Sequence, residues 1–165
     1  MAKWTMDLNK YAKEKKVQIR EVRKNYAFAL YSSIVRKTPV GDPDFDEDSG
    51  RARGNWQVTL NKPATGEVKD RRKTPKGKES IPKPQGDESI FITNNVPYIT
   101  KLEYGGYPSP VDKGSHTKKG VKPSRYEIKS QGGFSKQAPE GMVGVTLANN
   151  EAIFDAAVRS VKGNK

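Results

Sequence analysis

Residues 27–60 read AFALYSSIVRKTPVGDPDFDEDSGRARGNWQVTL and contain the transition that decides the fold. An apolar run, the longest in the chain, is followed by a proline, an acidic loop and a new apolar segment that starts at Trp56. Because a proline disfavours helical geometry in the residue before it, a helix should stop at Thr38. The stretch therefore predicts the junction between a long helix and a β-sheet.

A long amphipathic helix is predicted over residues 8–35. Apolar residues recur there at the spacing that places them on one helix face. They are Leu8, Tyr11, Ala12, Ile19, Val22, Tyr26, Ala29 and Leu30. Phe28, Tyr31 and Val35 add a second stripe, so the C-terminal half of the helix should be buried on more than one side. Asp7 is the predicted N-cap.

Two strands are predicted after the acidic loop, over residues 56–60 and 89–93, because apolar and polar residues alternate there. Between them, residues 61–88 are rich in Lys, Pro, Gly and Asp and contain almost no large apolar side chain. This composition predicts an extended arm or flexible insertion. The simplest connection of the two strands is a hairpin through this arm.

A short helix is predicted next. Pro97 suits its first position, and Gly105 stands just past its end, where a C-terminal cap is expected. Residues 106–138 are again rich in Gly, Pro, Ser and Lys, and they predict a second extended arm.

The C-terminal part predicts a third strand over residues 142–147 and a final helix that starts after Asn149 or Asn150 and ends at Gly163. The whole order predicts one α+β domain over residues 1–165. A long N-terminal helix and a C-terminal helix should pack on a small antiparallel sheet, with long Lys/Pro/Gly-rich loop insertions. The predicted core anchors are Trp56, Tyr98, Leu102 and Met142.

Charge and composition restrict the classes of function. The chain has 31 Lys and Arg against 19 Asp and Glu, with no Cys. The excess of positive charge favours an anionic partner, and the absence of Cys excludes disulfides, thiolate nucleophiles and Cys-ligated zinc. No apolar run approaches the ~20 residues that span a bilayer, and the N-terminus lacks the apolar stretch of a signal peptide. We therefore expect a soluble, unexported protein without a membrane partner.

Enzymatic chemistry finds little support in the sequence. His116 is the only histidine, so a histidine pair, a His-ligated zinc cluster or a serine triad of the usual sort cannot be built. The acidic loop places carboxylates at alternate positions, as calcium loops do, but Ser49 stands where the turn glycine and Asn55 where the bidentate Glu would be expected. A solvated acidic loop, or one that meets a basic face of a neighbouring copy, is the favoured interpretation. We predict no catalytic, metal-binding or cofactor-binding residue, and no enzyme.

A basic protein that binds nucleic acid without sequence preference is the alternative hypothesis. Basic residues cluster on the first helix and on the first arm, where phosphate contacts would be easy. They are Lys13, Lys15, Lys16, Arg20, Arg23 and Lys24, and then Arg71, Arg72, Lys73, Lys76 and Lys78. However, the sequence shows no aromatic pair interleaved with basic residues on a strand and no helix-turn-helix pattern.

Several segments together resemble one family. SSIVRKTPV leads into SGRARGNWQV, and ITNNVPYITKLEYGG and APEGMVGVTLANNEAIFDAAV follow in that order. This pattern is similar to that of phage neck and tail-completion proteins, the family that includes the minor tail protein Z of lambda. SGRARGNWQV resembles the family's turn into its first strand. ITNNVPYITKLEYGG resembles the family's corner between a strand and a short helix.

The resemblance implies a structural virion protein of a bacteriophage, without cofactors. Such minor tail proteins form or cap an oligomeric ring, most often a hexamer, at the head-proximal end of the tail, or they join the tail to the head connector. The implied partners are further copies of the chain, the tail terminator and tube, and the head–tail connector, with transient contact to the genomic DNA in the channel. The implied location is the neck or tail of the virion, and the host cytoplasm during assembly.

The predicted interface residues lie in the resembling segments and in the first arm. Long charged loops on a small core are costly unless they meet another surface, and a ring of repeated subunits supplies such surfaces. The candidates for contact with a neighbouring subunit or partner are Arg51, Arg53, Asn55, Glu103, Arg71, Arg72 and Lys73.

Overall fold

The protein is an α+β chain in which a long N-terminal helix, a two-stranded antiparallel sheet and C-terminal helices pack together. The computed structural model describes residues 2–40, 50–69, 77, 81–106, 111–112, 126–127, 130–131, 134–135 and 137–162. The acidic loop and most of the second arm lie outside the described residues, as does the basic part of the first arm.

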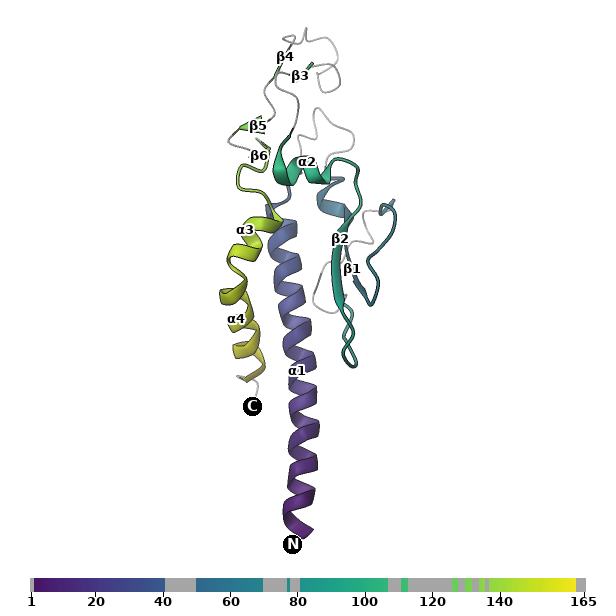
Figure 1. Ribbon diagram of the computed structural model, residues 1–165, viewed down its shortest axis with the longest axis vertical. Coiled ribbons are helices and arrows are strands. Elements are labelled where there is room, and N and C mark those ends of the chain that lie inside the picture. The colour runs from purple at the N-terminus through teal and green to yellow at the C-terminus, as the bar shows by residue number, and fades with distance from the viewer. Residues whose placement is uncertain are drawn as a thin grey trace.

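The first helix is α1, Ala2–Lys37. It ends where Pro39 predicts, and the Thr38 amide still bonds back to the carbonyl of Ile34 at 3.0 Å. Its start is earlier than predicted, so Asp7 lies inside the helix and does not cap it. At 1.5 Å per residue α1 is about 54 Å long. In Figure 1 its N-terminal part extends well past the rest of the described elements.

The sheet is a hairpin of β1, Trp56–Leu60, and β2, Ile90–Asn94. The strands are antiparallel, with Trp56 opposite Asn94 and Leu60 opposite Ile90. A short 3-10 helix, η1, Arg53–Asn55, leads into β1. The predicted hairpin is confirmed, and it lies beside α1 on the side away from α4 (Figure 1).

Two short helices follow the hairpin in different parts of the chain. The first, α2, Ile99–Tyr104, ends at Gly105 with φ 67°, as predicted for a glycine cap. The second, α3, Val143–Ala148, occupies the segment for which a third strand was predicted. That prediction is wrong, because a carboxylate from α2 binds the first amides of this segment and holds it as a helix.

The last helix, α4, Asn150–Lys162, packs along α1. The two helices run in opposite directions: Ser33 contacts Thr146 of α3, just before α4 begins, and Asn25 contacts Ser160 near the end of α4. Between these contacts Tyr26 and Phe154 form an edge-to-face ring pair with centroids 5.4 Å apart. Figure 1 shows that α4 covers the C-terminal half of α1 and ends beside its middle.

The C-terminal part of the first arm, residues 81–88, is packed, although the composition of the arm predicted a flexible insertion. Ile81 is only 1% exposed, and the Pro84 side chain is also fully buried. Arg23 of α1 donates to the carbonyls of Gly86 and Glu88, and Lys83 pairs with Glu21. The part over residues 81–88 therefore packs on α1 and is not a free insertion.

The second arm contains only short strand pairs among its described residues. They are β3, Val111–Asp112, with β4, Tyr126–Glu127, and β5, Ser130–Gln131, with β6, Phe134–Ser135.

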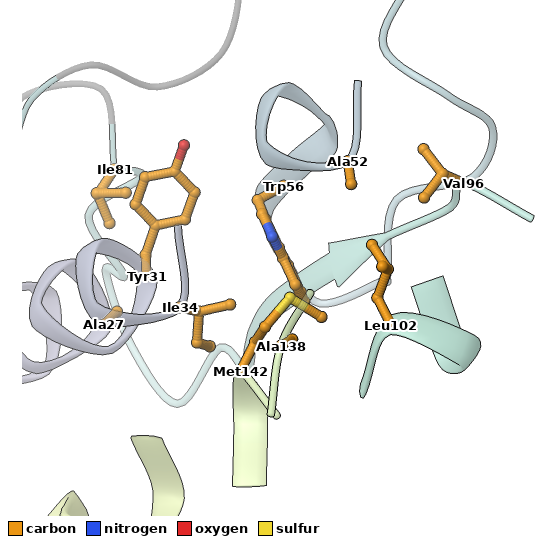
Figure 2. Packing of buried hydrophobic residues seen from close by; sticks show 10 residues of the cluster. All are labelled: Ala27, Tyr31, Ile34, Ala52, Trp56, Ile81, Val96, Leu102, Ala138 and Met142. Carbon is orange, nitrogen blue, oxygen red and sulfur yellow. The ribbon is translucent and has the colours of Figure 1, made fainter. Parts of the chain in front are cut away.

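The hydrophobic core lies where the C-terminal half of α1, the hairpin, α2 and the entry to α3 meet. Trp56, Leu102 and Met142, three of the four predicted core anchors, are at most 4% exposed. Tyr98, the fourth, is partly buried and packs against the cluster. Figure 2 shows Trp56 beside Met142 at the centre of the cluster, with Tyr31 and Ile81 on one side. The described residues contain no helix that combines the length and apolar character needed to cross a bilayer.

Candidate functional site

Glu103 forms a buried link between α2 and α3. Its Oε2 accepts the backbone amides of Met142 at 2.7 Å and Val143 at 2.9 Å, and its Oε1 accepts the Gly144 amide at 2.8 Å. The side chain is 6% exposed, and its partners lie about 40 positions later in the chain. A negative charge beside free amides stabilises a helix start. Glu103, predicted to contact a neighbouring subunit, is instead engaged inside the chain.

Gly141 makes this link possible. Its φ is +72°, and a Cβ built on it would lie 2.9 Å from Oε1 of Glu103. Any other residue would therefore combine a strained backbone with a collision against the carboxylate. The sequence contains both residues, but nothing in their spacing shows that they meet.

Thr38 and Trp56 join the end of α1 to the hairpin. The indole Nε1 donates to the Thr38 hydroxyl at 2.8 Å, and that hydroxyl donates to the Ile34 carbonyl at 2.8 Å. Arg53 donates through Nε to the Thr38 carbonyl at 2.7 Å and through Nη2 to the Arg36 carbonyl at 3.3 Å. A cation at a helix C-terminus satisfies carbonyls that have no helical partner. Arg53 therefore caps α1 within the chain.

The remaining interface candidates divide into described and undescribed residues. Asn55 is 1% exposed, and its side chain bonds to the Arg51 carbonyl and the Val68 amide, so it is an internal residue. Arg51 is partly buried, pairs with Glu67 at 2.8 Å and lies over the ring of Tyr98. The basic residues Arg71, Arg72 and Lys73 lie outside the described residues.

A shallow pocket of about 150 Å³ opens between α2, the hairpin and α3. Its lining is mainly apolar, and both carboxylate oxygens of Glu103 at its wall already hold backbone amides. Tyr104 at the rim is 69% exposed. Within the described residues no three His, Cys, Asp or Glu side chains gather in a way that could hold a metal ion. The pocket thus offers surface for contact but no free acid or base.

The helices also carry exposed apolar and charged side chains on their outer faces. Among the described side chains of α1, α3 and α4, four large apolar ones are nearly half exposed or more: Val17 47%, Ile19 58%, Leu147 49% and Phe154 46%. On α1, Lys13, Lys15 and Lys16 are exposed, whereas Arg20, Arg23 and Lys24 are partly buried. On α4, Glu151 and Asp155 are exposed. These two helix surfaces are the strongest candidates for contact with another molecule.

The helical spacing predicted both α1 and α4, but it did not show which of their apolar residues remain exposed. Exposure depends on how far α4 reaches along α1, which no local pattern contains. Comparisons with protein-family models, with curated proteins and with solved structures found no match to this chain.

Proposed function

We propose that this protein is a structural component of a tailed-phage neck, where it forms a ring at the head-proximal end of the tail and joins the tail to the head connector. By its resemblance the ring is a hexamer, and the role is tail completion without enzymatic chemistry. The possible neighbours are the tail terminator and tube on one side and the connector on the other.

One observation carries this proposal: the separate segments that resemble neck proteins form a single packed unit. Thr38 bonds to Trp56, Ser33 lies 3.0 Å from Thr146, and Glu103 holds the Met142 amide. Every one of these residues belongs to a resembling segment. The resemblance therefore concerns the packed part of the chain and not its loops.

The exposed helix surfaces also support an assembly role. Ile19 on α1 is 58% exposed, and Phe154 on α4 is 46% exposed although its ring contacts Tyr26 of α1. Each of them lies beside exposed charged residues, and exposed apolar groups with a polar rim are typical of surfaces that are covered in an assembly.

A cryo-electron-microscopy map of the particle that contains this protein tests the proposal. We expect a ring of copies at the head–tail junction, with density that fits α1, the hairpin and α4. A gene deletion should give separate full heads and tails. Joined particles in the deletion strain, or a junction fully explained by other chains, would refute the role.

Binding of DNA without sequence preference is the second candidate, because Lys13, Lys15 and Lys16 are exposed on the projecting part of α1. Phosphate contacts of this kind weaken steeply with salt. Titration of the protein with duplex DNA at several salt concentrations tests this candidate. Binding that is absent at low salt would eliminate it.

A further inference from the structure

The projecting part of α1 carries an apolar residue flanked by positive charge. Ile19 is 58% exposed. Lys15 and Lys16 precede it by about one helical turn, so they flank it on the same side of α1. Both lysines are exposed, and Lys15 also donates to Gln18 of its own helix at 3.2 Å. This surface, called the basic face, consists of Lys15, Lys16 and Ile19.

The side of α4 carries the complementary combination. Glu151, Phe154 and Asp155 have the spacing that brings them to one side of a helix. Phe154 is 46% exposed although its ring also meets Tyr26, and both carboxylates are exposed. This surface, called the acidic face, consists of Glu151, Phe154 and Asp155.

The two faces cannot meet within one chain. α4 runs antiparallel to α1, and Phe154 lies beside Tyr26. Ile19 is about 10 Å farther along α1 in the direction of its N-terminus, at 1.5 Å per residue. Glu151 lies in the first turn of α4 and Asp155 one turn later, whereas Figure 1 shows α1 extending past the C-terminal end of α4. Any contact between the faces therefore joins two copies.

We propose that the basic face of one copy packs on the acidic face of the next copy, with Ile19 against Phe154 and the two lysines beside Glu151 and Asp155. The contact uses different surfaces on the two copies, and such head-to-tail contacts generate rings or filaments. This inference rests on the proposed function and specifies the contact that would build its ring.

Charge favours the acidic face of a second copy over other partners for the basic face. Two basic faces would repel each other, so an α1–α1 pair is disfavoured. A phosphate backbone would engage the lysines but would leave Ile19 and Phe154 exposed to water. An acidic face with its own aromatic residue satisfies both the charge and the apolar surface.

Paired charge reversals test the contact. The first variant is Lys15→Glu with Lys16→Glu, and the second is Glu151→Lys with Asp155→Lys. Association is measured by sedimentation velocity at fixed salt and at concentrations up to about 1 mM, where even weak contacts of about 4 kcal/mol are populated. Each variant alone should show a dissociation constant raised at least about tenfold, because like charges then face each other.

An equimolar mixture of the two variants should recover association to within about threefold of the native protein. In the mixture every contact between unlike variants again pairs opposite charges. Matched controls carry the same change in charge at exposed positions off both faces. These are Lys62→Glu with Lys69→Glu, and Asp87→Lys with Glu140→Lys, and they should leave association unchanged.

A second measurement does not depend on the folding of the charge variants. The chain contains no cysteine, so single cysteines can be placed by Ile19→Cys in one sample and Asp155→Cys in another. A short bismaleimide should couple the two samples. Val17→Cys is the matched control, because Val17 is 47% exposed but points about 200° away around α1 and should not couple.

The inference is overturned if the native protein stays monomeric at the highest concentration, if the mixture fails to recover association, or if Val17→Cys couples as well as Ile19→Cys. It is also overturned if the lysine reversals only weaken binding to duplex DNA, since α1 would then be a nucleic-acid surface. Recovered association with no ring at the head–tail junction would instead refute the proposed function and leave the contact standing. A ring at the junction without recovered association would refute the contact alone.

Discussion

The substitution Glu103→Gln tests how much the buried carboxylate contributes to stability. The amide side chain has nearly the same shape, but only one of its two terminal atoms can accept a hydrogen bond. If its oxygen takes the Oε2 position, the amides of Met142 and Val143 keep their acceptor, and the Gly144 amide faces an NH₂ group.

The expected loss follows from two contributions. A hydrogen bond to a charged group contributes about 1.5–3 kcal/mol. Removing the negative charge at the start of α3 costs a further 0.3–1 kcal/mol or so. We therefore expect the free energy of unfolding to fall by about 2–4 kcal/mol. Glu103→Ala should cost more, since all three amides lose their acceptor.

The assay is urea unfolding followed by circular dichroism and by the fluorescence of the two tryptophans, Trp4 and the buried Trp56. Glu140→Gln is the matched control, because Glu140 is exposed and lies just before the same helix. A surface change of this kind should stay within about 0.5 kcal/mol. If Glu103→Gln loses no more than the control, the carboxylate does not hold α3, and the account of this helix is wrong.

Further predictions concern the junction, the arm and pH. Thr38→Val removes the acceptor of the buried Trp56 indole and should lower the unfolding free energy by about 1–3 kcal/mol, measured by urea unfolding. Ile81→Ala should cost about 2–5 kcal/mol in the same assay if residues 81–88 pack as described; a loss near zero would mean that they do not. Burial raises the pKa of Tyr31 from 10.0 to about 12. The stability from its neutral form is complete below pH 10 and is lost as pH rises towards 12, because only the unfolded state ionises in this range. Tyr31→Phe should therefore show a shallower fall in melting temperature above pH 10.

Local patterns in the sequence predicted most of the secondary structure. Pro39 ends α1, the alternation after Asn55 and before Asn94 marks the hairpin, and Gly105 ends α2. These predictions hold because each depends on backbone geometry or side-chain periodicity within a few residues.

The segment MVGVTL, residues 142–147, shows where local patterns fail. Its β-branched residues favour a strand, yet from Val143 onward it is part of α3. A helix of six residues is marginal by itself, so its stability must come from outside the segment. The carboxylate of Glu103 binds its first amides, and Thr146 lies against Ser33 of α1.

For the candidate interface residues, too, some properties follow from the sequence and others only from the tertiary structure. Periodicity in the sequence determined that α1 and α4 are amphipathic, and composition determined that the chain is basic. Tertiary structure alone decided that Asn55 and Glu103 are internal, because a polar side chain can be buried only where distant backbone groups meet its hydrogen bonds. It also decided that Ile19 stays exposed, since α4 is too short to cover the whole length of α1.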